Sequence, residues 1–104
     1  MASKHVTLRL TPAELSELTQ LRGVLERKAG KPVALQAAMR IAILSHPTAR
    51  LERKEYQGTR SVRIDLLAND DVQAALKRLQ SVNAGLSIAD IVLCTARILI
   101  AKPH

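Results

Sequence analysis

The chain has 104 residues and a formal net charge of +7, with 16 Lys and Arg against 9 Asp and Glu. This length allows one ordinary domain, or two very small units that share a core. Phe and Trp are absent and Tyr56 is the single aromatic residue, so a core has to be built from aliphatic side chains and Met. The charge favours a polyanionic partner. It is shared by the two halves, because residues 1–52 hold 8 basic and 4 acidic residues and residues 53–104 hold 8 and 5.

The residues of catalytic and metal sites are scattered along the chain. His5, His46 and His104 are far apart, and none stands at metal-ligand or triad spacing. There is no Gly-rich phosphate loop. Cys94 is the single cysteine, which excludes an internal disulfide and a zinc site built from cysteines, and we predict it to be a core residue. The sequence therefore predicts a protein that is not an enzyme and has no cofactor, metal ion or small-molecule substrate.

The longest apolar stretch, at 88–101, is too short to span a bilayer and is interrupted by Asp90 and Arg97. The first ten residues, MASKHVTLRL, contain no apolar secretory segment. We therefore expect a cytoplasmic protein without a membrane partner.

The first half begins with a strand pattern and continues with a helix. Residues 6–10, VTLRL, alternate between apolar and polar, which predicts a strand with one apolar and one polar face. The letters TPAE at 11–14 predict a helix start, with Thr11 as the N-cap and Glu14 closing a capping box. Gly30 is suited to the left-handed position that ends this helix.

A second helix is predicted from about Pro32. It ends before Pro47, because a residue that precedes proline resists helical dihedral angles. Residues 48–59, TARLERKEYQGT, are polar and strongly charged, which predicts a linker. These boundaries divide the chain into a first unit at 1–47, the linker at 48–59 and a second unit at 60–104.

The second half repeats this order. Residues 62–66, VRIDL, alternate again, and Asn69 begins a helix that is predicted to end at Gly85. Ser87 then caps a last helix, with Asp90 three residues later as in a capping box. This helix is apolar nearly all round, which predicts a central and buried position.

A lone strand followed by two helices leaves the strand's backbone hydrogen-bonding groups without partners. Two copies remove this problem, because their strands can pair antiparallel into a ribbon above four helices. The predicted fold is thus mostly α with a two-stranded antiparallel β-ribbon, in which a β-α-α unit repeated twice forms an intramolecular pseudo-dimer. Such a ribbon fits the major groove of B-DNA.

The strand patterns VTLRL and VRIDL, the unit length and the letters GLSIADIV at 85–92 resemble the ribbon-helix-helix (Arc/MetJ) superfamily. With both units on one chain, the layout is similar to the TraY family of conjugative plasmids. The first unit departs from the pattern, because GKPVALQAAM at 30–39 has no Ser at the start of its second helix. The resemblance implies sequence-specific binding of double-stranded DNA by a bacterial protein associated with the nucleoid or a plasmid.

In such a protein the outward side chains of the ribbon read the bases. By position, the resemblance assigns this role to Thr7, Arg9, Arg63 and Asp65, with His5 and Ser61 at the outer ends. The chemistry agrees, because Arg can donate two hydrogen bonds to guanine and Thr offers a hydroxyl and a methyl group. Asp can accept a hydrogen bond from the amino group of cytosine.

The resemblance also implies that the N-terminus of each second helix anchors the DNA backbone, where free N–H groups and the helix dipole attract anions. Ser87 fits this role in the second unit. In the first unit, Lys31 and the amides near Val33 are expected to replace it, and we assign Lys4 to the same phosphate contacts.

The outward faces of the two predicted strands differ, so we expect an asymmetric DNA site rather than the palindrome of a homodimer. We also expect a chain that folds without dimerising, while side-by-side association on DNA stays open. The expected role is transcriptional regulation, in particular repression, or assembly of a nucleoprotein complex such as a conjugative relaxosome.

Two alternatives from other classes stay open. Many antitoxins share this fold, and the 48–59 linker is the segment expected to bind a toxin here. A protein-interaction module would instead bind its partner through the helical side of one or both units.

Overall fold

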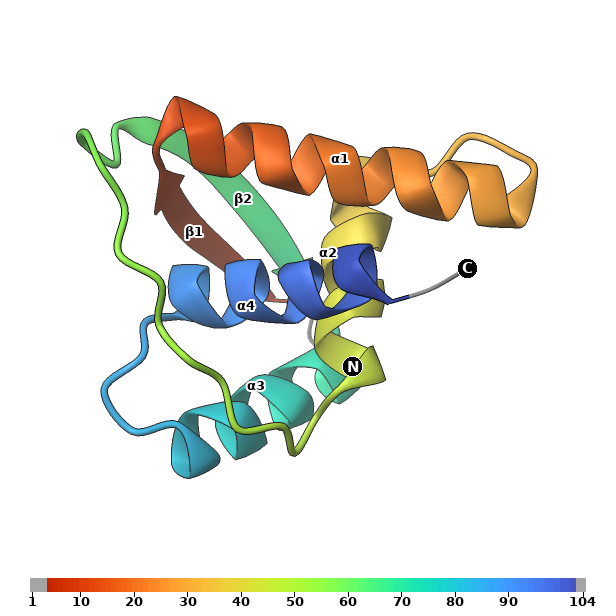
Figure 1. Cartoon of the computed structure of the whole chain (residues 1–104). Helices are drawn as coiled ribbons and strands as arrows, with labels where there is room; N and C mark the ends of the chain where they lie inside the picture. Colours follow the sequence, from red (N-terminus) through yellow and green to blue (C-terminus); the bar gives the residue numbers. More distant parts are fainter. Residues whose placement is uncertain (1–3, 103–104) are drawn as a thin grey trace.

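Within residues 4–102, four helices lie on one side of a two-stranded ribbon, and the last of them, α4 (Ile88–Ala101), runs through the middle of the helical layer (Figure 1). This computed structural model describes residues 4–102. In chain order the elements are β1 (Lys4–Leu10), α1 (Pro12–Ala29), α2 (Leu35–Ser45), β2 (Val62–Ala68), α3 (Asp70–Val82) and α4 (Ile88–Ala101). The prediction of a mostly helical chain with one two-stranded antiparallel sheet is confirmed.

The alternating sequence gives the ribbon two different faces. β1 and β2 pair antiparallel, with Leu8 opposite Ile64 and Thr7 opposite Asp65. Successive side chains of a strand point to opposite faces. The apolar set therefore turns toward the helices, and its fully buried members are Leu8, Leu10, Leu66 and Ala68. The polar set on the other face is exposed.

Three helices start with the caps expected from the sequence. Thr11 and Glu14 form a capping box at α1, and Ser87 and Asp90 form another at α4. The side chain of Asn69 caps α3. Each cap binds backbone N–H groups that a helix start leaves without partners, so these starts are fixed by local sequence.

The start of α2 differs from the expectation. The helix begins at Leu35 rather than at about Pro32, and its N-cap makes no side-chain hydrogen bond. The N–H of Val33 instead donates to Glu26 Oε2 in α1, at 3.1 Å. A contact with the preceding helix thus holds the residues before Leu35 outside the helix.

The end of α3 and the path of the linker depend on one side chain. α3 ends at Val82 rather than at Gly85, and Asn83 forms its C-cap. Asn83 Nδ2 donates to the carbonyl of Ala49 at 2.8 Å, and its Oδ1 accepts the N–H of Leu51 at 2.6 Å. The linker therefore follows the helices closely, although it contains no helix or strand.

α4 lies at the centre of the core, as its apolar sequence predicted. Every residue from Ala89 to Ala96 is buried, and the helix packs against all three other helices and β1. Cys94 belongs to this set, which confirms it as a core residue. Burial raises the pKa of its thiol.

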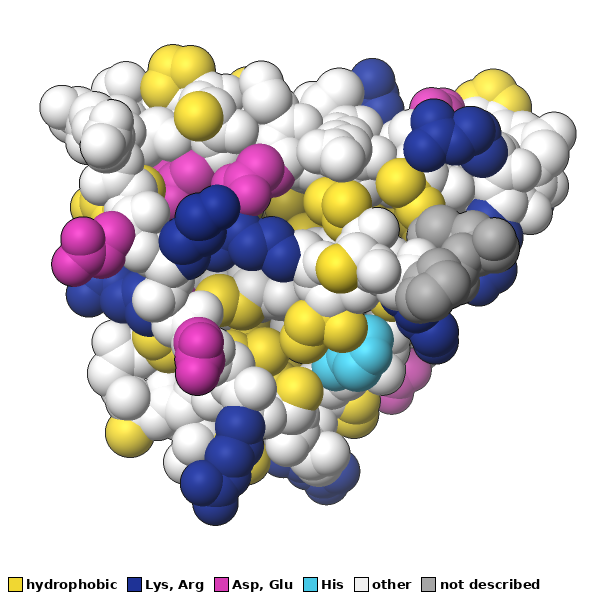
Figure 2. Space-filling model, in the orientation of Figure 1, with side chains coloured by type: hydrophobic (Ala, Val, Ile, Leu, Met, Phe, Trp, Pro, Cys, Tyr) yellow, Lys and Arg dark blue, Asp and Glu magenta, His cyan; other side chains and the backbone are white. Residues whose placement is uncertain are grey.

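Arg60, two residues before β2, joins the starts of α1 and α4. Its guanidinium donates to both oxygens of Glu14, at 3.0 and 2.9 Å, and to Asp90 Oδ1 at 2.7 Å. Both carboxylates are buried members of capping boxes. Burial opposes their ionisation, but the hydrogen bonds from Arg60 and the helix caps outweigh it, so the pKa of each lies below its usual value. Figure 2 shows acidic and basic side chains next to one another between α1 and α4.

We expect Arg60→Met to lower the free energy of unfolding by about 3–5 kcal/mol, because it leaves the buried Glu14 without an ion-pair partner and leaves Asp90 with only the 3.8 Å contact to Arg53. Urea denaturation measures the change. The matched control is Arg97→Met, which removes a partly exposed bidentate pair with Glu17. This control should cost about 1 kcal/mol or less, and equal losses in the two variants would contradict the importance of Arg60.

The pH dependence of stability is a second measure of the same cluster. A carboxyl with a lowered pKa in the folded chain stabilises it above the pKa of the unfolded chain, and this stabilisation is lost as pH falls through the folded value. The unfolding free energy should therefore decrease as pH drops below about 4.5, the ordinary value for Glu14. In Arg60→Met the decrease should be shallower, and equally steep curves would contradict the pairing.

Candidate nucleic-acid interface

The residues expected to read bases lie on the outward side of the ribbon. All six are exposed: His5, Thr7, Arg9, Ser61, Arg63 and Asp65. Five of them alternate with the inward residues of β1 and β2, and we call these five (His5, Thr7, Arg9, Arg63 and Asp65) the ribbon face. Ser61 lies beside them, one residue before β2 begins.

A hydrogen bond connects the two strands at the middle of the ribbon face. Thr7 Oγ1 donates to Asp65 Oδ1 at 3.2 Å, between residues that are direct partners in the register. This contact orients the carboxylate. Its second oxygen has no hydrogen-bond partner among residues 4–102, so it remains available as an acceptor.

Two cations face each other at one end of the ribbon face. Arg9 and Arg63 are direct partners in the register, and both are exposed. Neither forms an ion pair with another residue in the described part of the chain. Like charges directly opposite each other destabilise a sheet. Arg9 and Arg63 therefore repel each other, and a bound anion would reduce this repulsion.

A side chain that sequence analysis did not identify closes the outer edge of β2. Gln36, the second residue of α2, accepts the N–H of Leu67 through Oε1 at 2.8 Å and donates through Nε2 to the carbonyl of Asp65. Arg40 donates to the carbonyl of Leu67 at 3.5 Å. These contacts join residues about thirty positions apart and depend on α2 packing beside β2. A local sequence pattern therefore does not predict them.

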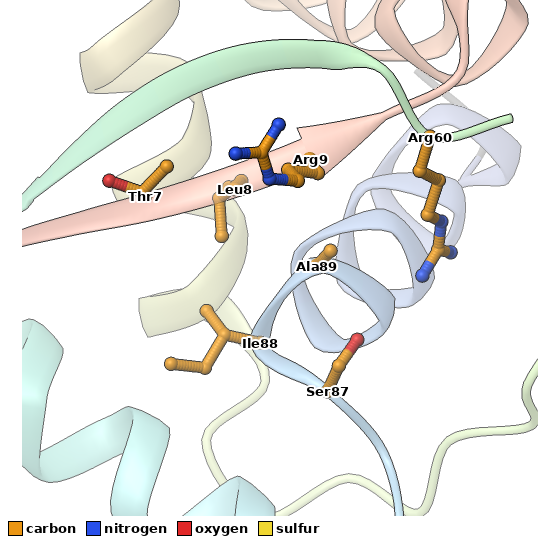
Figure 3. A pocket seen from close by; sticks show the side chains of 7 residues that line it. All are labelled: Thr7, Leu8, Arg9, Arg60, Ser87, Ile88 and Ala89. Carbon is orange, nitrogen blue, oxygen red and sulfur yellow. The ribbon is translucent and has the colours of Figure 1, made fainter.

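A groove of about 490 Å³ lies along the other strand, between β1 and the start of α4 (Figure 3). It is lined mainly by three residues of β1 and three at the start of α4: Thr7, Leu8, Arg9, Ser87, Ile88 and Ala89. In Figure 3, Arg60 points toward α4, whereas Arg9 points away from that helix. The groove thus connects the ribbon face to a helix N-terminus, a position where unpaired N–H groups attract anions.

The residues expected to bind phosphate are placed differently in the two halves. Ser87 is exposed in the groove, and its hydroxyl accepts the N–H of Asp90 at 3.2 Å. Lys31 is exposed before α2, but the N–H of Val33 is already bound by Glu26. The amide of Val33 is therefore not available to a phosphate, and a carboxylate stands beside it.

Lys4, the last of the expected phosphate ligands, is exposed at the first position of β1, opposite Ala68. By alternation it belongs to the side of the ribbon that faces the helices, so it lies at the margin of the ribbon and not on the ribbon face.

Comparison with known proteins assigns no family to this chain: no family model matches it, no curated protein matches it and no solved structure matches it. None of the helices in residues 4–102 is long and apolar enough to cross a membrane. Within the same residues, no three His, Cys, Asp or Glu side chains gather closely enough to hold a metal ion.

We expect Arg63→Gln to raise the free energy of unfolding at low salt by about 0.2–1 kcal/mol, because it removes the repulsion from Arg9. The gain should shrink as salt is added, because salt screens exposed charges. Arg50→Gln is the control, since it removes an exposed linker arginine that has no cross-strand partner. Thermal or urea unfolding at two salt concentrations measures the effect, and a loss of stability at low salt would contradict the repulsion.

Proposed function

We propose that this chain binds double-stranded DNA in a sequence-specific manner by inserting its two-stranded ribbon into the major groove. One observation carries the proposal: the ribbon buries its apolar face on the helices and exposes Thr7, Arg9, Arg63 and Asp65 on the other. The major groove is wide enough to admit a two-stranded ribbon, and each base pair presents a distinct pattern of donors and acceptors there.

The ribbon face carries suitable groups for reading such a pattern. Arg9 and Arg63 form no ion pair with any residue in 4–102, and each guanidinium can bind O6 and N7 of a guanine. Asp65 is oriented by Thr7 and retains a free oxygen, which can accept a hydrogen bond from the amino group of cytosine. The net charge of +7 favours association with the phosphate backbone.

The proposal includes the pairing of two equivalent β-α-α units within one chain. The order β-α-α occurs twice, and the units pack crosswise, with α2 against β2 and α4 against β1. A pseudo-dimer of this kind needs no second chain, so its stability is independent of protein concentration. Because the two halves of the ribbon face carry different residues, each molecule reads an asymmetric site.

The DNA backbone is bound mainly on the β1 side in this proposal. The start of α4 places Ser87 and the first N–H groups of the helix next to the ribbon face, in the position expected for a phosphate. On the β2 side, Lys31 supplies a cation, but Glu26 occupies the N–H of Val33 and Gln36 occupies the N–H of Leu67. Lys4 adds a cation at the margin.

The cellular role that fits such a module is repression of transcription, or an accessory role in a nucleoprotein complex of a mobile element. This step follows from the resemblance to the ribbon-helix-helix proteins, and in particular from the two units on one chain. It rests on analogy at the level of the fold, and the proposed cytoplasmic, nucleoid- or plasmid-associated location rests on the same analogy.

A second candidate function is recognition of a protein partner through the helices. Ile41, Leu44 and Val82 are large apolar side chains with 41%, 43% and 42% of their surface exposed. Ile41 and Leu44 lie three positions apart on α2 and are therefore neighbours on one side of the helix, and contiguous exposed apolar surface marks partner sites. Binding that is indifferent to any duplex, together with loss of partner binding in Ile41→Asp, would favour this candidate.

Selection of bound duplexes from a random pool tests DNA binding. The protein should recover one asymmetric sequence, and retention of it in gels should weaken steeply with salt. Arg9→Ala and Arg63→Ala should each relax the preference at a different base position and cost about 1–3 kcal/mol of binding free energy.

Arg50→Ala is the matched control for both variants, because this linker arginine lies outside the ribbon face. It should weaken binding to all sequences equally and leave the base preferences intact. If Arg9→Ala and Arg63→Ala also retain the parental preferences, the ribbon face is not the reading surface.

A further inference from the structure

The two outer edges of the ribbon are chemically different. On β2, the Gln36 side chain bonds the N–H of Leu67 and the carbonyl of Asp65. Leu67 therefore directs its N–H away from β1, although it is the register partner of His5. In an antiparallel pair, when one residue turns its backbone N–H and carbonyl away from the partner strand, the residue opposite turns its own backbone groups away as well. The N–H and carbonyl groups of His5, and by alternation those of Thr7 and Arg9, thus point to the outer edge of β1.

No side chain of the described residues closes this edge of β1. The hydrogen bonds in residues 4–102 include none from a side chain or a loop to the backbone of His5, Thr7 or Arg9. Ala89 is the second residue of α4, as Gln36 is the second residue of α2. Figure 3 shows Ala89 on the side of α4 that faces β1, in the groove of about 490 Å³. Ala89 thus stands at the position equivalent to Gln36, but its side chain is too short to reach the backbone of β1, and the groove lies in this space.

We propose that the open edge of β1 binds an extended acidic segment of a partner protein, which adds to the ribbon as a third strand. The edge of β2 indicates which groups would bind the edge of β1, because there the amide of Gln36 supplies one hydrogen-bond donor and one acceptor. The backbone of an added strand supplies the same groups at successive positions. Leu8, Ile88 and Ala89 provide an apolar wall for alternate side chains of the segment.

The charge of β1 selects an acidic segment. The strand reads KHVTLRL, with Lys4, His5 and Arg9 and no acidic residue, and opposite charges across a strand pair are favourable. A second copy of the chain fits poorly, because antiparallel self-pairing centred on Thr7 places His5 opposite Arg9. Basic residues on an open edge oppose such self-association.

The bound segment regulates DNA binding, and this step rests on the proposed function. The groove contains Ser87 and borders Thr7 and Arg9, so an acidic strand there occupies the position proposed for a DNA phosphate. Segment and duplex therefore compete for the β1 side of the molecule.

Amide chemical shifts of the ¹⁵N-labelled full chain test the docking. The probe is an acetylated and amidated five-residue peptide of alternating Glu and Val. It should shift the amide signals of His5, Thr7 and Arg9, and leave Leu67 unchanged. A peptide with methylated backbone nitrogens should bind at least ten-fold more weakly, as should one with Lys in place of Glu. No shift on β1, or equal binding of either control peptide, overturns the proposal.

Two variants that exchange the edges complete the test. Ala89→Gln should fill the groove and weaken the peptide at least ten-fold, and Gln36→Ala should open β2 and add shifts at Leu67. Both spectra also report whether the variant is folded. If Ala89→Gln folds and binds the peptide as the wild type does, the proposed site is wrong, and Gln36→Ala without new shifts at Leu67 equally contradicts it.

The peptide should also release the selected duplex from the wild type in a gel, and the control peptide with Lys in place of Glu should not. Peptide binding without release of DNA overturns the regulatory step and leaves the docking site standing. If the wild type binds no duplex at all, the proposed function is wrong. The amide shifts of β1 still test whether the peptide binds at this edge.

Discussion

The pairing of β1 with β2 is the constraint on which the rest of the structure depends. Each strand is the only strand partner of the other in residues 4–102, and residues that face each other lie far apart in the chain, 58 positions in the case of Thr7 and Asp65. A two-stranded ribbon is marginal in water unless one of its faces is covered. The helices therefore have to close under the ribbon, with the apolar α4 at their centre, and the linker has to return the chain to the side of β1.

Arg60 and Asn83 hold this return path. Asn83 binds the beginning of the linker to the end of α3, and Arg60 joins its end to the buried acids of two capping boxes. The linker is thus part of the folded body and not a loose tether. The same contacts fix the start of α4 beside β1, so the position of Ser87 relative to the ribbon face follows from the way the linker is held.

The elements predicted from sequence are those governed by local rules. Alternation in VTLRL and VRIDL gave both strands and their exposed faces, and the caps at Thr11 and Ser87 placed two helix starts. The contacts that escaped prediction are long-range pairs of side chains. Gln36 on the edge of β2, Arg60 between two helix starts and Glu26 on the N–H of Val33 depend on how finished elements pack. No propensity or spacing within one element encodes these contacts.

The most direct test of the account uses the side-chain Nε–H signals of the arginines during titration with the selected duplex. Arg60 and Arg97 already bind carboxylates through their guanidinium groups, while Arg9 and Arg63 form no ion pair within the described part of the chain, residues 4–102. The account predicts large shifts for Arg9 and Arg63 and almost none for Arg60 and Arg97. Shifts confined to the linker arginines Arg50 and Arg53, with the two ribbon signals unmoved, would contradict it.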